Sequence, residues 1–233
     1  MRALWLAALL APLSARAWPA DVYLDVEKGG EKFQRLGAVD WLEVEDPSIA
    51  QVEWLSSSNE LLVTGKAVGR TLVLLYAQGT AAVWRIRVRE KGAPPQPVAS
   101  PSALEAASKA CPGMTMDAKE PSSSVTVRND ACRQALLAFF QTDAVRASES
   151  GVSFELPALQ AQLQAIQTAL ARVGEKVTAK YSGAGLILEG ASTPAGQRRL
   201  LWEVFRNTVG RMVLDDRLDI PDAGTLRPGT VSP

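Results

Sequence analysis

The chain has 233 residues, of which 47% are hydrophobic and 21% charged, and its 25 basic residues balance its 25 acidic residues. This balance provides no long-range attraction for nucleic acid or anionic lipid. The chain has no histidine, so the commonest general base, metal ligand and partner of a Ser or Cys nucleophile is missing. The composition favours a globular binding protein of one or two domains over an enzyme.

Residues 1–17 have the three-part pattern of a secretory signal peptide. Arg2 gives a cationic start, residues 3–13 form a short apolar run, and residues 14–17 end in small side chains. The run is shorter than the roughly twenty residues that a membrane-spanning helix needs. The alternative is an N-terminal core helix. We expect cleavage after Ala17, which removes two arginines and leaves 23 basic and 25 acidic residues, a net charge of −2. The expected location is the periplasm, where disulfides form.

Residues 18–90 have the pattern of a small β-rich domain. Gln78-Gly79 is a turn signal between the last two β-prone runs. Along the last run, apolar residues alternate with a row that contains Arg85, Arg87 and Arg89. We interpret this row either as a solvated face or as a docking edge for an acidic partner. The predicted strands cover residues 22–26, 39–44, 51–55, 61–64, 70–77 and 82–88.

Residues 91–101 separate this domain from the rest of the chain. Four prolines fall within eight residues of this stretch, and they are incompatible with the interior of a sheet or helix. A Pro-rich segment of this kind is a semi-rigid spacer, which would set the separation of the two domains. A second Pro/Gly-rich stretch, residues 221–233, is predicted to be a loose tail.

Residues 102–220 are predicted to form a layered α+β domain, which makes α+β the fold class of the whole protein. Ser102 to Glu105 is a capping box, and Asp130 is expected to cap the next helix. A longer helix follows Pro157 and ends at Gly174. Further elements are predicted at 125–127 (strand), 176–181 (strand), 186–189 (strand), 194–209 (helix, capped by Ser192 or Thr193 and ended by Gly210) and 212–218 (strand).

The two cysteines, Cys111 and Cys132, are predicted to lie on the inward faces of two helices. In an exported chain an even cysteine count favours a disulfide, here a structural bridge between those helices. The alternative, a redox site, favours a close C-x-x-C pair, and the spacing of these two cysteines is too wide for that motif.

Two linked motifs carry a resemblance to a known family. Residues 44–52, VEDPSIAQV, contain an acid-proline turn, and residues 61–73, LLVTGKAVGRTLV, contain a Gly-bounded loop followed by a strand. Together they resemble the pilus-formation N-terminal domain found at the front of secretins of Flp/Tad-type pilus and related secretion systems. The resemblance covers residues 22–88. It implies the periplasmic part of such a protein without the long secretin pore region.

Residues 156–220 are similar to the BON or ring-building modules that follow in such proteins. This second resemblance depends on the order of the elements and on the Gly-bounded strand Leu186-Ile187-Leu188-Glu189-Gly190.

Two features suggest other chemistry. Lys66 follows a glycine as in phosphate-binding loops, but the Walker pattern has a different spacing and opens a helix, whereas a strand is predicted here. Asp215, Asp216 and Asp219 form the one notable acidic cluster, which is predicted to be either an exposed strand end or, at most, a weak site for a hard cation. We therefore assign no catalytic, cofactor-binding or metal-binding residue.

The sequence thus predicts a non-enzymatic, periplasmic interaction or assembly component of a pilus or secretion apparatus. Its expected partners are a secretin, an inner-membrane platform protein or copies of itself. The candidate contact residues are Lys66, Arg85 and Arg87. The alternative is an envelope-binding BON-type module for phospholipid or peptidoglycan, against which the near-neutral charge and the lack of a basic amphipathic helix argue.

Overall fold

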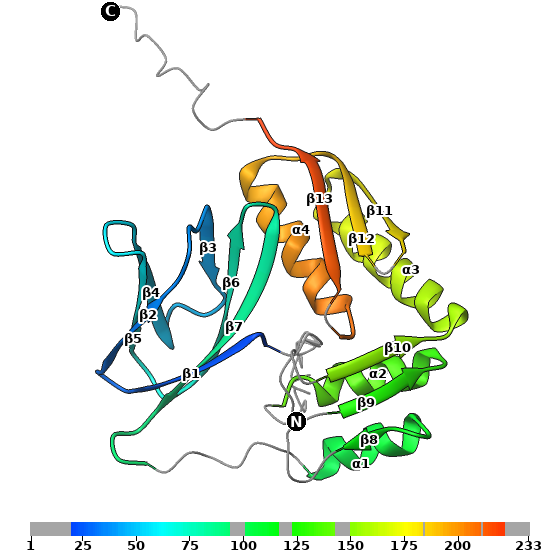
Figure 1. Ribbon diagram of the computed structural model, residues 1–233, viewed down its shortest axis with the longest axis horizontal. Coiled ribbons are helices and arrows are strands. Elements are labelled where there is room, and N and C mark those ends of the chain that lie inside the picture. The colour runs from blue at the N-terminus through cyan, green and yellow to red at the C-terminus, as the bar shows by residue number, and fades with distance from the viewer. Residues whose placement is uncertain are drawn as a thin grey trace, which may run out of the picture.

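The computed structural model describes residues 20–93, 101–116, 123–142, 150–183, 185–210 and 212–221. The expected signal peptide, residues 94–100 of the Pro-rich spacer and the tail beyond Pro221 lie outside these residues. Within them the fold is α+β, as predicted, with thirteen strands in four sheets and four α-helices (Figure 1). We call residues 20–93 the front half and the described part of 101–221 the rear half.

The front half consists of two β-sheets packed face to face. Sheet A has the strand order β1-β7-β6-β3, and sheet B has the order β2-β5-β4. β1 runs parallel to β7, whereas the other pairs are antiparallel. The strands are β1 (Val22–Glu27), β2 (Glu31–Arg35), β3 (Trp41–Val44), β4 (Ala50–Leu55), β5 (Glu60–Gly65), β6 (Gly69–Ala77) and β7 (Thr80–Arg89).

One strand of the front half, β2, was absent from the sequence prediction. It is an edge strand that pairs only with β5, and four of its five residues are exposed. Its sequence EKFQR has neither an alternating apolar pattern nor many β-branched residues. The backbone pairing with β5 therefore forms this strand, and its own side chains contribute little.

The rear half begins with a helical unit stapled by a disulfide. Cys111, directly after α1, and Cys132, on α2, are bonded, with their Cα atoms 4.9 Å apart. A sheet of order β10-β9-β8 lies beside these helices. The elements are α1 (Pro101–Ala110), β8 (Thr115–Met116), β9 (Ser123–Val127), α2 (Asp130–Phe139) and β10 (Ser150–Phe154).

The N-cap of α2 lies one residue before the position that the sequence predicted. The side chain of Asn129 accepts a hydrogen bond from the backbone N–H of Cys132, so Asn129 is the N-cap. Asp130 instead occupies the first helical turn and forms an ion pair with Arg133 at 2.7 Å. Both residue types are good caps, and the local sequence did not distinguish between them.

The rear half ends with a three-stranded sheet. α3 (Leu156–Val173) ends at Gly174, which has the left-handed φ of 83° that this position requires. Thr193 caps α4 (Pro194–Asn207) by accepting a hydrogen bond from the backbone N–H of Gly196. β11 (Lys176–Ser182), β12 (Gly185–Ala191) and β13 (Val213–Asp219) form the sheet in the order β11-β12-β13.

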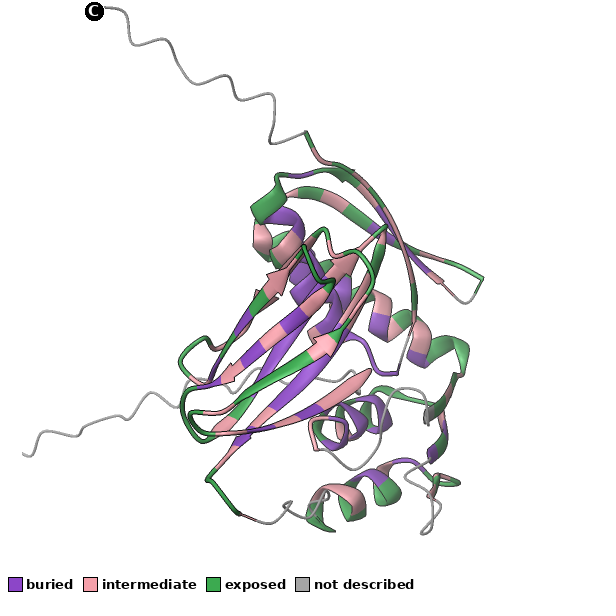
Figure 2. Cartoon of the chain, turned by 60° about the vertical axis from the view of Figure 1, so that its left-hand side comes forward, coloured by how far each residue is buried: buried purple, intermediate pink, exposed green. Residues whose placement is uncertain are grey.

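The two halves share a hydrophobic core. In β6, alternate residues point to opposite faces of sheet A, so that Val73 and Leu75 pack with sheet B while Leu72 and Leu74 pack with α3, α4 and β12. Figures 1 and 2 show sheet A alongside α4, with buried residues concentrated where strands and helices meet. The two halves are therefore packed together. We had expected the Pro-rich spacer to set the separation of two domains.

Candidate functional site

Arg85, one of the three candidate contact residues, is buried between the halves. Its side chain lies on the face of β7 that points to the rear half, and the residue is 4% exposed. Its Nη1 donates a hydrogen bond of 2.7 Å to the backbone carbonyl of Gln141, and its guanidinium lies 5.8 Å from the ring centre of Tyr23. Arg85 is therefore an internal junction residue, and neither interpretation of the arginine row applies to it.

Arg87 lies two residues along the same row but at the rim of the junction. Its guanidinium makes two hydrogen bonds to the carboxylate of Asp25, Nε to Oδ1 at 2.7 Å and Nη2 to Oδ2 at 2.6 Å. Asp25 is on β1, which pairs with β7 in the register that places Asp25 opposite Arg87. Arg87 is thus held in place by a neighbouring strand while remaining partly exposed.

Lys66 is exposed on the loop between β5 and β6, and this loop is bonded to the acid-proline turn. The carbonyl of Ile49 accepts hydrogen bonds from the backbone N–H groups of Lys66 and Ala67, at 2.8 and 3.1 Å. The strand end before the loop is closely packed, because a Cβ at Gly65 would lie 2.5 Å from the carbonyl oxygen of Glu27. The two sequence motifs therefore form one structural unit.

The structure brings the Lys66 loop and Arg87 to one surface. Val68, two residues after Lys66 in this loop, is 50% exposed and lines a small cavity of about 290 Å³ together with Arg87 and Asp25. We call Lys66, Val68 and Arg87 the motif face. An exposed apolar side chain near cationic groups is suited to contact with a protein partner.

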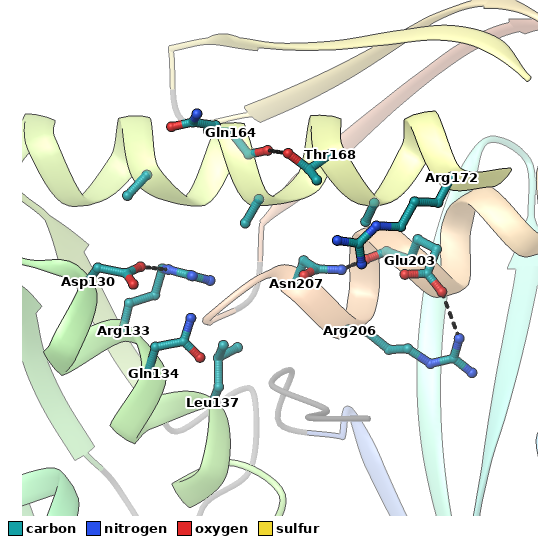
Figure 3. Close-up of a pocket in the computed structure, with 13 residues that line it drawn as sticks. Asp130, Arg133, Gln134, Leu137, Gln164, Thr168, Arg172, Glu203, Arg206 and Asn207 are labelled. Atoms are coloured by element: carbon teal, nitrogen blue, oxygen red, sulfur yellow. Dashed lines mark hydrogen bonds and ion pairs between the residues drawn. The ribbon is translucent and has the colours of Figure 1, made fainter. Parts of the chain in front are cut away.

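A second, larger hollow lies in the rear half between α2, α3 and α4 (Figure 3). We call it the helix groove. It has a volume of about 790 Å³, and it adjoins a hollow of about 690 Å³ that extends to Glu43 and Glu45 of the front half. Sequence reasoning did not identify it, because its walls come from three separate helices. Its lining residues are Asp130, Arg133, Gln134, Leu137, Ala161, Gln164, Ala165, Thr168, Ala169, Arg172, Glu203, Arg206 and Asn207.

Asp216 of the acidic cluster has a structural partner in each half. Its Oδ2 accepts hydrogen bonds of 2.6 Å from the hydroxyl of Tyr76, on β6, and from the side-chain amide of Gln197, on α4. Burial and this carboxylate raise the pKa of Tyr76 above the usual value for tyrosine. Asp215 pairs instead with Arg217, and the described residues contain no metal-binding group of three or more His, Cys, Asp or Glu residues.

Comparison with known proteins gives one family match. Residues 23–89 match the family described as "Pilus formation protein N terminal region". The front half is therefore of the pilus-formation N-terminal class, in agreement with the resemblance predicted over residues 22–88. No curated protein matches the chain. None of the helices in the described residues is both long and apolar enough to cross a membrane.

Two solved structures have partial similarity to the chain. Domains 4 and 5 of the S-layer protein SbsC are 14% identical with a TM-score of 0.25, over 30% of this chain and 42% of that chain. CdsD, a structural protein of the type III secretion system of Chlamydia trachomatis, is 15% identical with a TM-score of 0.27, over 62% of this chain and 74% of that chain. The chain thus spans less than half of the SbsC fragment.

Proposed function

We propose that this protein is a non-enzymatic assembly component of a pilus or secretion apparatus in the periplasm, of the Flp/Tad or type II-like kind. The observation that supports the proposal most directly is the family match of residues 23–89. The expected signal peptide, residues 1–17, supports the location. The partner would be a secretin or an inner-membrane platform protein.

The motif face provides the mechanism of docking. Val68 offers an apolar contact, while Lys66 of the same loop and Arg87 of the same cavity supply cationic groups for acidic groups of the partner. Arg87 is preorganised by its two hydrogen bonds to Asp25, so little side-chain entropy is lost on binding. Arg85 is excluded from this role by its burial.

A crosslinking pull-down tests this function. The tagged mature chain is recovered from its native envelopes after crosslinking, and bound proteins are identified by mass spectrometry. We expect a secretin or platform protein to be recovered with the wild type and to be depleted with Lys66→Glu or Val68→Asp. No such protein above background with the wild type would contradict the proposal.

Two matched variants control for non-specific effects of the substitutions. Lys176→Glu makes the same charge change at an exposed position in the rear half. Val213→Asp makes the same apolar-to-acid change at a residue that is 72% exposed. Equal depletion by these controls would show that the motif face is not the contact.

The alternative function is an envelope-binding module of the BON type. The element order α3-β11-β12-α4-β13 is the observation that favours it, because this order is the basis of the resemblance over residues 156–220. Flotation with vesicles that contain anionic phospholipid separates the two functions. Recovery of the protein with the vesicles, and of no apparatus protein in the pull-down, would place the envelope-binding function first.

A further inference from the structure

The helix groove contains a buried cation whose hydrogen bonds are incomplete. Arg133, on α2, is 4% exposed, and its Nε is bonded to Asp130 at 2.7 Å. Its Nη1 is also buried but has no hydrogen-bond partner among the described residues. Figure 3 shows this guanidinium between α2 and α3, inside the groove. A buried charged donor without an acceptor is uncommon in folded proteins, and an acceptor from a bound ligand would satisfy it.

A second cation on the opposite wall is also available to a ligand. Arg172, in the last turn of α3, is exposed and lines the groove, and no hydrogen bond or ion pair links it to any residue that the structure describes. Arg206, on α4, is bonded to Glu203 at 2.9 Å, and its buried Nε has no hydrogen-bond partner among the described residues. All three arginines of the groove therefore have capacity for further acceptors.

The floor of the groove suits a peptide chain. Ala161, Ala165 and Ala169 recur every fourth residue of α3 and line the hollow, so a ligand backbone can approach the helix closely. Gln134 lines the same hollow with an exposed side chain, whose amide can both donate to and accept from peptide groups. The volume of the groove, about 790 Å³, also exceeds what a small anion needs.

The ionisable side chains of the groove favour an acidic ligand. Three arginines, Arg133, Arg172 and Arg206, line the groove together with two acids, Asp130 and Glu203. The adjoining hollow has no such excess of positive charge, because its three arginines are matched by Glu43, Glu45 and Glu203. An acidic ligand is therefore attracted to the groove more than to the adjoining hollow.

We propose that the helix groove binds an extended acidic peptide segment of a partner protein, with its carboxylates accepted by Arg133 and Arg172. This site is distinct from the motif face and does not depend on the function proposed for that face. Arginine makes its strongest hydrogen bonds with carboxylates, which explains the preference for Glu or Asp side chains over neutral ones.

Fluorescence anisotropy with defined peptides tests the proposal on the full mature chain. The probe is a fluorescein-labelled peptide of alternating alanine and glutamate, and the competitors are the same peptide with glutamine, the same peptide with lysine, and inorganic phosphate. We expect the glutamate peptide to bind at least about tenfold more tightly than the glutamine peptide, since two charge-assisted hydrogen bonds are lost in the latter.

Substitutions on α3 locate the binding site. Ala165→Glu fills the groove floor and adds a negative charge, whereas Ala171→Glu makes the same change at an exposed position of the same helix that does not line the hollow. We expect Ala165→Glu and Arg172→Gln to weaken binding of the glutamate peptide at least about tenfold and Ala171→Glu to leave it unchanged. Circular dichroism confirms that each variant retains its helices.

Several results would overturn the proposal. They are equal binding of the glutamate and glutamine peptides, binding of phosphate as tight as that of the peptide, and wild-type affinity in folded Ala165→Glu. Sedimentation provides the remaining check. If the wild type self-associates and Ala165→Glu alone abolishes this, the occupant is a second copy of the chain and not an acidic partner.

Discussion

The two faces of sheet A differ in how far they could be understood from local sequence. The face toward sheet B is made of alternating apolar residues, such as Trp84, Ile86 and Val88, and it forms the core of the front half. The opposite face combines Leu72 and Leu74 with arginines, and the rear half packs against it. The difference shows that a Pro-rich spacer can mark a boundary in sequence that is not a boundary in packing.

The largest expected effect comes from truncation in the shared core. Leu74 is 1% exposed and packs with the rear half. We expect Leu74→Ala to lower the free energy of unfolding by about 2–5 kcal/mol, the usual cost of removing buried methyl groups and leaving a cavity. Chemical denaturation monitored by circular dichroism and by tryptophan fluorescence measures this loss. If the halves share a core, circular dichroism and tryptophan fluorescence both show a single unfolding transition.

Removal of the disulfide should have a comparable but more local effect. The bridge Cys111–Cys132 closes a loop of about twenty residues, so the double variant Cys111→Ala/Cys132→Ala should lose roughly 3 kcal/mol. Thermal unfolding with and without a reducing agent checks the result. A reducing agent should destabilise the wild type and leave the double variant unaffected. A wild type insensitive to complete reduction would contradict the prediction.

The two arginines on the same row of β7 should respond differently to replacement. Arg85→Met leaves the carbonyl of Gln141 without its buried donor, and we expect a loss of about 1–3 kcal/mol. Arg87→Met removes a partly exposed ion pair and should cost less, about 1 kcal/mol or below. Urea denaturation of both variants gives the comparison. A larger loss of stability for Arg87→Met than for Arg85→Met would contradict the assignment of Arg85 to the junction and of Arg87 to its rim.

The smallest expected effect is a change in pH dependence. Since the pKa of Tyr76 is raised in the folded state, the unfolded chain loses this proton first, and stability falls as the pH rises above about 10. Tyr76→Phe removes this contribution, so its stability should decline less steeply with pH in the alkaline range. Denaturation midpoints at several pH values above 9 measure the slope. Identical slopes for both proteins would contradict the assignment.

Where the chain carries its own signals, the sequence was sufficient to predict the elements. Residues 156–173 show a helical apolar stripe with Pro157 at the start and Gly174 at the end, and α3 has these bounds. Strands with alternating apolar residues, such as β7, were also predicted. By contrast, β8 and β10 have two and five residues and form through pairing with β9. Such short strands depend on tertiary contacts that a local pattern does not encode.

The candidate sites also divide into those that local sequence could predict and those that depend on tertiary contacts. Lys66 and its loop were identified because glycines flank it at Gly65 and Gly69, and the structure places Lys66 on the surface. The burial of Arg85 could not be predicted from the sequence. A row of arginines on a strand is expected to face solvent, and the local sequence does not show that another element covers it. The helix groove was missed for a related reason, since residues such as Arg133 and Arg172 meet only after three helices pack together.

Hydrogen exchange in a matched pair of variants tests the shared core most directly. Leu74 and Leu75 are adjacent in β6 and both buried, but they point to opposite faces of sheet A. In Leu74→Ala the amides of α4 should exchange faster than in the wild type, while in Leu75→Ala the increase should be confined to the front half. Unchanged exchange of α4 in Leu74→Ala would show that the two halves do not share a core.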